Sequence, residues 1–94
     1  MKQYLSSGQT AKLRDLGFEE PKSYSNIEWD GAEAYDYEHN YSIGELIEIL
    51  DGQGIEIKNF EYWIVEHEWY TSTKDELIDA LYDCVVKLKE LKKL

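Results

Sequence analysis

The 94-residue chain contains one cysteine, one proline and ten basic residues. A single cysteine cannot form an internal disulfide, so the reducing cytosol is the expected compartment. No apolar run is long enough to span a membrane, and residues 1–10 lack the apolar core of a signal sequence. A chain of this length has apolar surface for one core, which predicts a single domain over residues 1–94.

Acidic residues outnumber basic ones by 20 to 10, and the excess is uneven. Residues 19–68 carry 14 acids and two lysines, whereas residues 1–18 have a net charge of +2 and residues 69–94 are neutral. The negative electrostatic field of this central segment repels nucleic acid and anionic membranes and attracts a basic partner. We therefore expect no direct nucleic-acid binding and no membrane association. An acidic surface that serves solubility alone is the simpler alternative.

The clearest periodic pattern lies at the end of the chain, over residues 73–94. Thr73 and Glu76 have the spacing of a capping box, which predicts that a long helix begins there. Early acids and late lysines complement the helix dipole. The apolar face consists of Leu77, Leu81, Cys84, Leu88 and Leu91, widened by Ile78 and Val85.

Two shorter helices are predicted upstream. Ser6 or Ser7 can cap the first, over residues 8–16, and Gly17 can end it. Ser42 can cap the second, with Glu45 closing another capping box. The apolar stripe of this second helix consists of Ile43, Leu46, Ile47 and Leu50.

The remaining segments favour strands. Residues 22–41 fit either two short strands around Asp30-Gly31 or an acidic loop. Ile55 and Ile57 alternate with polar residues, which predicts a half-buried strand. A longer strand is predicted over residues 62–70, followed by a turn at residues 71–72; its better core face is Trp63, Val65, His67 and Trp69. The chain is therefore predicted to be α+β, with a small antiparallel sheet of two to four strands and the long C-terminal helix packed across one face.

No catalytic set is recognisable, because a nucleophile needs a base and an orienting group. His67 lies among tryptophans and is expected to pack with one satisfied nitrogen, while His39 is expected to be exposed. We therefore predict that the protein is not an enzyme and holds no cofactor and no metal.

A small ligand- or calcium-binding module is the alternative prediction. Residues 26–31 match four positions of a calcium loop through Asn26, Glu28, Asp30 and Gly31, but Tyr37 stands where the bidentate glutamate belongs. The predicted Trp63–His67–Trp69 face is the other place where such a module could hold a small ligand.

The preferred prediction is a protein-interaction surface that combines carboxylates with tyrosines. Its candidate residues are Glu28, Asp30, Glu33, Tyr35, Asp36, Tyr37, Glu38, Glu66 and Glu68. Carboxylates attract a basic protein. One version of this hypothesis is nucleic-acid mimicry, in which the carboxylates take the place of phosphates. Tyrosines supply the aromatic anchors that interfaces favour. A homodimer through a free strand edge, or through the strand face of Tyr62, Ile64 and Tyr70, is also open.

The segments LGFEEPKSY, YSIGELIEIL and DELIDALYDCVVKLKE resemble a group of small uncharacterised proteins from phages, prophages and mobile elements of gut bacteria. Together they cover 35 of the 94 residues, and they match helix caps, apolar stripes and a helix stop. The resemblance implies a context and a fold, and it carries no assigned activity and no catalytic residue. Small proteins of that origin often bind host factors, which by analogy favours an interaction role.

Overall fold

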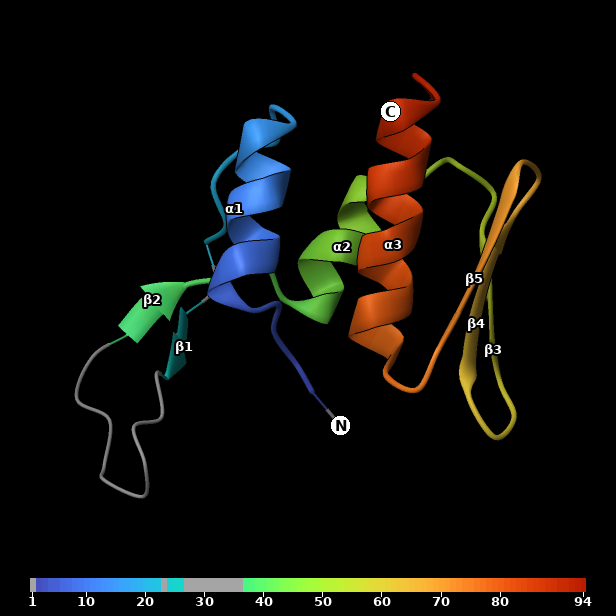
Figure 1. Ribbon diagram of the computed structural model, residues 1–94, viewed down its shortest axis with the longest axis horizontal. Coiled ribbons are helices and arrows are strands. Elements are labelled where there is room, and N and C mark those ends of the chain that lie inside the picture. Colours follow the sequence, from blue (N-terminus) through green and yellow to red (C-terminus); the bar gives the residue numbers. More distant parts are fainter. Residues whose placement is uncertain (1, 23, 27–36) are drawn as a thin grey trace.

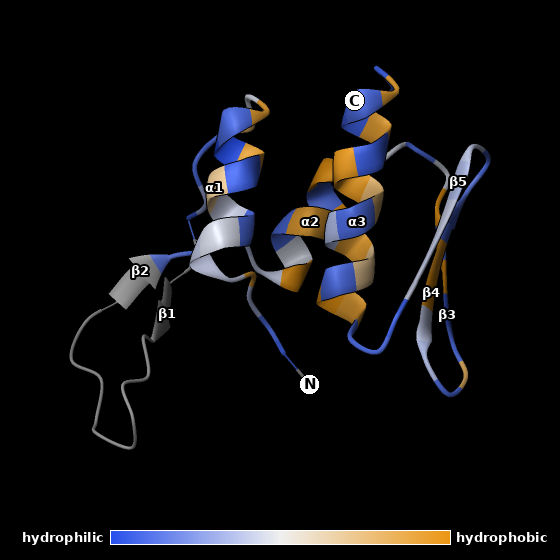
Figure 2. Ribbon diagram, viewed as in Figure 1, coloured by the Kyte–Doolittle hydropathy of each residue, from blue (hydrophilic) through white to orange (hydrophobic). Residues whose placement is uncertain are grey.

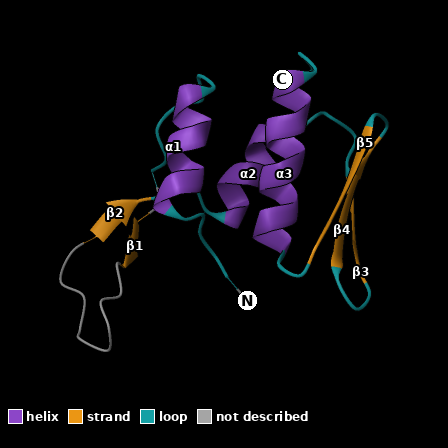
Figure 3. Cartoon of the chain, viewed as in Figure 1, coloured by secondary structure: helices purple, strands orange, loops and turns teal. Residues whose placement is uncertain are grey.

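The computed structural model describes residues 2–22, 24–26 and 37–94. In order, its elements are α1 (Ser7–Asp15), β1 (Tyr24–Asn26), β2 (Tyr37–His39), α2 (Ile43–Ile49), β3 (Glu56–Asn59), β4 (Trp63–His67), β5 (Tyr70–Lys74) and α3 (Leu77–Glu90). Within the described part, β1 pairs with β2 and the strands β3-β4-β5 form a second antiparallel sheet (Figure 3). The predicted α+β class is therefore confirmed.

Helix α3 lies between α2 and the three-stranded sheet, as Figure 1 shows, and it contacts α2, β4 and β5. Apolar residues run along both α2 and α3 (Figure 2). The α3 residues that are buried in this core are Leu77, Ile78, Ala80, Leu81, Cys84, Val85 and Leu88. The predicted helix face is thus confirmed except at its end, where Leu91 follows the helix and is 40% exposed.

The predicted start of α3 is wrong. Thr73 belongs to β5, and Glu76 occupies the N-cap position without a side-chain capping bond. The Glu76 carboxylate instead accepts a hydrogen bond from the backbone N–H of Lys2 at 3.0 Å. Pairing with β4 engages the backbone groups of residues 70–74 that face it, and β-branched threonines suit a strand. A sheet partner distant in sequence therefore outweighs the local capping signal.

The predicted strand over residues 62–70 is in fact a hairpin. Strand β4 ends at His67, and β5 runs back from Tyr70, so Glu68 and Trp69 form the turn. Val65 is fully buried, as predicted, but Trp69 is 60% exposed, and the Lys93 ammonium lies 5.1 Å from the centre of its ring. The Trp69 backbone N–H donates to Nδ1 of His67, which confirms one satisfied nitrogen on that ring.

Two apolar residues are more exposed than their patterns predicted. Ile57 is 39% exposed because β3 forms the edge of its sheet and α3 packs over β4 and β5. Ile47 is 41% exposed, whereas Leu46 and Leu50 are buried and Ile49 packs against the core instead. Helix α2 therefore turns a face centred on residues 46 and 50 toward α3.

Both short helices carry the predicted caps. Ser6 and Gln9 form a reciprocal capping box at α1, and Ser42 and Glu45 form one at α2. Gly17 ends α1 with a left-handed backbone, φ +94°, which a residue with a Cβ adopts at a cost. The next residue, Phe18, donates its N–H back to the carbonyl of Leu13 at 3.2 Å. This bond directs the chain out of α1 toward the core.

A half-buried carboxylate contact joins β5 to α3. Asp83 on α3 accepts hydrogen bonds from the Tyr70 hydroxyl at 2.6 Å and from the Ser72 hydroxyl at 2.9 Å. The bond to Asp83, aided by burial, raises the pKa of Tyr70 from 10.0 to about 12. Burial and, second, the charge of Asp83 raise the pKa of the Cys84 thiol from 9.0 to about 11. Both protons are therefore held more tightly in the folded state than in the unfolded chain.

Stability should fall steeply in alkali. Below pH 9 both groups are protonated in either state, and above it the unfolded chain releases first the Cys84 proton and then the Tyr70 proton. The free energy of unfolding, measured by urea titration at successive pH values, is therefore expected to drop between pH 9 and 12. In Tyr70→Phe the free energy of unfolding should fall less steeply above pH 10, because the hydroxyl that titrates is gone. A stability that stays constant up to pH 12 would contradict these contacts.

Candidate functional site

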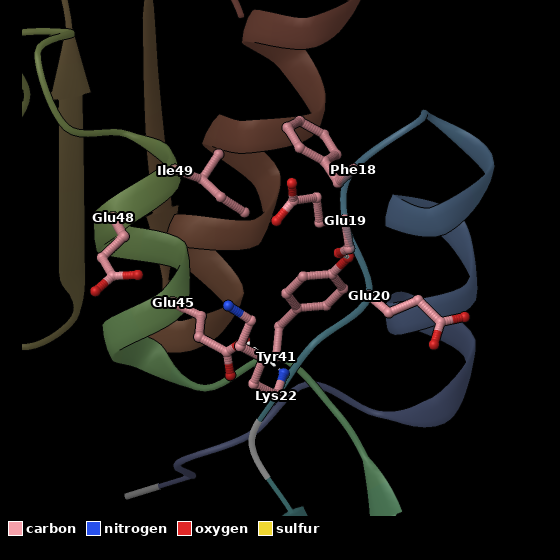
Figure 4. Close-up of a pocket in the computed structure, with 8 residues that line it drawn as sticks. All are labelled: Phe18, Glu19, Glu20, Lys22, Tyr41, Glu45, Glu48 and Ile49. Carbon is pink, nitrogen blue, oxygen red and sulfur yellow. Dashed lines mark hydrogen bonds between the residues drawn. The ribbon is translucent and has the colours of Figure 1, made fainter.

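A cleft of about 430 Å³ opens between the segment after α1 and the helix α2. Its lining combines apolar and acidic side chains, and Figure 4 shows how they lie. The lining residues are Phe18, Glu19, Glu20, Lys22, Tyr41, Glu45, Glu48 and Ile49. Phe18 and Ile49 are half-buried and Tyr41 is only 2% exposed, so the apolar part forms the floor.

Three hydrogen bonds hold the two walls of the cleft together. The Tyr41 hydroxyl donates to the backbone carbonyl of Glu19. The backbone N–H of Lys22 donates to a Glu45 carboxylate oxygen at 3.0 Å. Nδ1 of His39 lies 3.1 Å from the carbonyl oxygen of Pro21. Segment 19–22 is thus attached to segment 39–45, and the cleft has a fixed shape.

Segment 39–45 is also attached to the N-terminal part of the chain. The Thr10 hydroxyl on α1 donates to Asn40 Oδ1 at 2.7 Å, and both residues are buried. The backbone N–H of Leu5 donates to the Tyr41 carbonyl at 2.9 Å. These bonds fix α1 relative to α2, and α2 packs on α3. The cleft is therefore supported from the core.

The acidic side chains do not all point the same way. In Figure 4 the Glu19 carboxylate extends between Phe18 and the Tyr41 ring, inside the cleft. Glu20 points away from it, and its Oε1 lies 3.7 Å from Nε of Arg14 on α1. Glu48 lies on α2 at the edge of the cleft, and its carboxylate points away from Phe18 and Tyr41. Glu19 is therefore the acidic group best placed to meet a bound molecule.

The residues that line the cleft carry a net negative charge. Four glutamates line it against the single lysine Lys22. Burial raises the pKa of the Tyr41 hydroxyl, Arg14 partly offsets this, and Glu45, Glu20 and Glu19 raise it further. Tyr41 thus stays protonated at neutral pH and continues to donate its hydrogen bond. A negative cleft around a neutral phenol favours cations.

Carboxylates above an aromatic floor suit a lysine or arginine side chain. The ammonium or guanidinium can pair with Glu19, while the aliphatic stem lies on the rings of Phe18 and Tyr41. A cation of the chain itself already lies over one of these rings, because the Lys89 ammonium is 5.3 Å from the centre of the Phe18 ring. The arrangement can therefore recognise an extended basic side chain by charge and by apolar contact together.

Among the residues predicted for the interaction surface, the structure describes the side chains of Glu66 and Glu68 alone. Glu28, Asp30, Glu33, Tyr35 and Asp36 lie outside the described residues. Tyr37 and Glu38 belong to β2, and only their backbone is described. Glu66 on β4 is 3.1 Å from the Lys58 ammonium, and Glu68 is exposed in the β4–β5 turn. The sheet that carries these two lies on the far side of α3 from α1 (Figure 1).

Two alternative sites were predicted, a calcium loop and a tryptophan-bearing strand face. Asn26 is the last residue of β1, and the rest of the predicted calcium loop up to residue 36 lies outside the described residues. Within the part of the chain that is described, no group of three His, Cys, Asp or Glu residues could hold a metal ion. The Trp63–His67–Trp69 face is not formed as predicted, because Trp69 sits in a turn.

Sequence reasoning missed the cleft for a physical reason. Its walls come from segments about twenty residues apart, and the bonds that join them involve backbone groups and His39. That histidine was predicted to be exposed, but it is half-buried in β2 against Pro21. The usable signal was the acidic pair before the proline, Glu19 and Glu20, together with the acidic capping box at Ser42.

No protein family, curated protein or solved structure matches this chain. The resemblance to phage and mobile-element proteins therefore stays a prediction. Among the described residues, no helix combines the length and the apolarity that crossing a bilayer requires.

Proposed function

We propose that this protein is a non-enzymatic interaction module that binds a basic protein partner through the acidic cleft. The cleft carries the proposal because it joins four glutamates to an apolar floor of Phe18, Tyr41 and Ile49. Charge alone would serve solubility equally well. A cleft with an aromatic floor adds the contacts that a specific complex needs.

Binding would proceed in two stages. The net charge of −10 first attracts the basic partner over several ångströms and speeds the encounter. A lysine or arginine side chain of the partner then enters beside Glu19 and packs on Phe18 and Tyr41. Mimicry of nucleic acid is a special form of this proposal, in which the partner is itself a nucleic-acid-binding protein. The partner would be a basic cytoplasmic protein of the cell that hosts the phage or mobile element.

Removing cleft charge should weaken binding to a lysine- and arginine-rich peptide. In the double variant Glu19→Gln/Glu48→Gln the affinity, measured by calorimetry, is expected to fall about tenfold, because two attractive charges at the cleft are lost. The matched control Glu61→Gln/Glu68→Gln changes the net charge equally, with both sites exposed on the sheet. Its affinity should change by less than about twofold.

Glu45 is left unchanged in this test because it caps α2. Affinity should also fall as the ionic strength rises, since salt screens exposed charges. Equal losses in the two double variants would show that the peptide responds to net charge alone, and the cleft would then lose its role.

A further inference from the structure

Strand β3 forms one edge of the three-stranded sheet, and all four of its residues are exposed. The Phe60 N–H donates to the Tyr62 carbonyl at 3.0 Å, across the turn that joins β3 to β4. In an antiparallel ladder the residues that bond to the neighbour alternate along the strand. Lys58 and Glu56 therefore direct their backbone groups to β4, and Ile57 and Asn59 direct theirs outward from the sheet.

The sequence of β3 is complementary to itself when it runs antiparallel. If Ile57 of one copy lies opposite Ile57 of a second copy, Glu56 of each copy lies opposite Lys58 of the other. The outward N–H of Ile57 then donates to the C=O of Ile57 in the copy, and the outward C=O accepts from the N–H of Ile57 in the copy. Opposite charges directly across two strands stabilise their pairing.

The sheet faces agree with this register. Ile57 pairs with the buried Val65 in β4, so its side chain is on the face that α3 covers. Glu56 and Lys58 are on the other face, where the Lys58 ammonium is 3.7 Å from Glu56 and 3.1 Å from Glu66. Pairing would bring the two exposed Ile57 side chains together on one face. It would place the two charge pairs on the other.

We propose that two copies of this chain associate through β3, in the register that sets Ile57 opposite Ile57, to form a continuous six-stranded antiparallel sheet. The second copy is the occupant because it supplies the Glu-x-Lys order that the edge requires. Strand β3 does not line the acidic cleft, so the dimer would leave both clefts open. The dimer also pairs the two β3 edges, and an unpaired edge makes a strand prone to unspecific association.

Charge exchange tests the register. In Glu56→Lys the new lysine would lie opposite Lys58 of the copy, and in Lys58→Glu the new glutamate would lie opposite Glu56 of the copy. Each variant alone should dimerise about tenfold more weakly than the wild type, because two attractive pairs become repulsive. A mixture of the two variants restores opposite charges at both pairs and should recover the wild-type dimer in analytical ultracentrifugation. Thermal melting confirms that each variant is folded.

Cysteine cross-linking gives a second measurement that does not depend on charge. Cα atoms across a hydrogen-bonded antiparallel pair are about 5.5 Å apart, within the range that a disulfide spans. Ile57→Cys should therefore form a disulfide-linked dimer under mild oxidation, and the native Cys84 is buried. In Asn59→Cys each new cysteine lies opposite residue 55 of the copy and far from the other new cysteine. This variant should therefore cross-link far more slowly. A wild-type chain that is monomeric at millimolar concentration, a mixture that fails to associate, or equal cross-linking at both positions would overturn the proposal.

Discussion

Replacing Leu81 by alanine is expected to lower the free energy of unfolding by about 3 kcal/mol. Leu81 is fully buried in α3, the helix that contacts α2 and two strands of the sheet. The truncation removes apolar contacts and leaves a cavity that rigid neighbours fill only in part. A domain of this size has a total stability of about 5–10 kcal/mol, so the loss is a large fraction of it. Urea denaturation followed by tryptophan fluorescence measures the change.

Leu91→Ala is the matched control for this prediction. It removes the same atoms from the same segment, but Leu91 is 40% exposed. The expected loss is below about 1 kcal/mol, since little apolar area returns to water. Equal losses at the two positions would mean that α3 is not the centre of the core.

Replacing Asp83 by alanine should lower the free energy of unfolding by about 2 kcal/mol. The carboxylate accepts from both Tyr70 and Ser72, and hydrogen bonds to a charged acceptor are stronger than neutral ones. Ser72 is 1% exposed, so its hydroxyl would be left buried without this acceptor. The change also removes the main cause that raises the Tyr70 pKa. Spectrophotometric titration of the variant should show the Tyr70 pKa returning toward 10.0.

Tyr70→Phe provides the comparison, because it removes one of the two bonds and keeps the ring. Its loss should be about 1 kcal/mol, smaller than that of the alanine variant. If Asp83→Ala were as stable as the wild type, the contact between β5 and α3 would not contribute to folding.

Local patterns predicted the helices well. The caps at Ser6 and Ser42 and the stop at Gly17 each involve residues that are close in sequence. These features can therefore be predicted from the sequence alone. The same kind of signal misled at Thr73, where pairing with β4 placed the residue in a strand. Local signals hold where no distant segment competes for the same backbone groups.

Alternation predicted strand faces but not strand ends. Val65 was correctly assigned to the core, whereas Trp69 continues the same pattern and lies in a turn. The alternation carries through a two-residue turn without a glycine or proline to mark it. The acidic cleft was not predicted, because its walls meet only after α1 and α2 are fixed by bonds such as the one from Thr10 to Asn40. The uneven charge predicted a negative surface within residues 19–68, and the four glutamates that line the cleft belong to that range.

The most direct measurement is the mapping of amide chemical shifts of the labelled protein during titration with a lysine- and arginine-rich peptide. The proposed function predicts that the largest changes occur around the cleft, at Phe18, Glu19, Tyr41 and Ile49. The largest changes at the sheet instead, around Glu66 and Glu68, would contradict it.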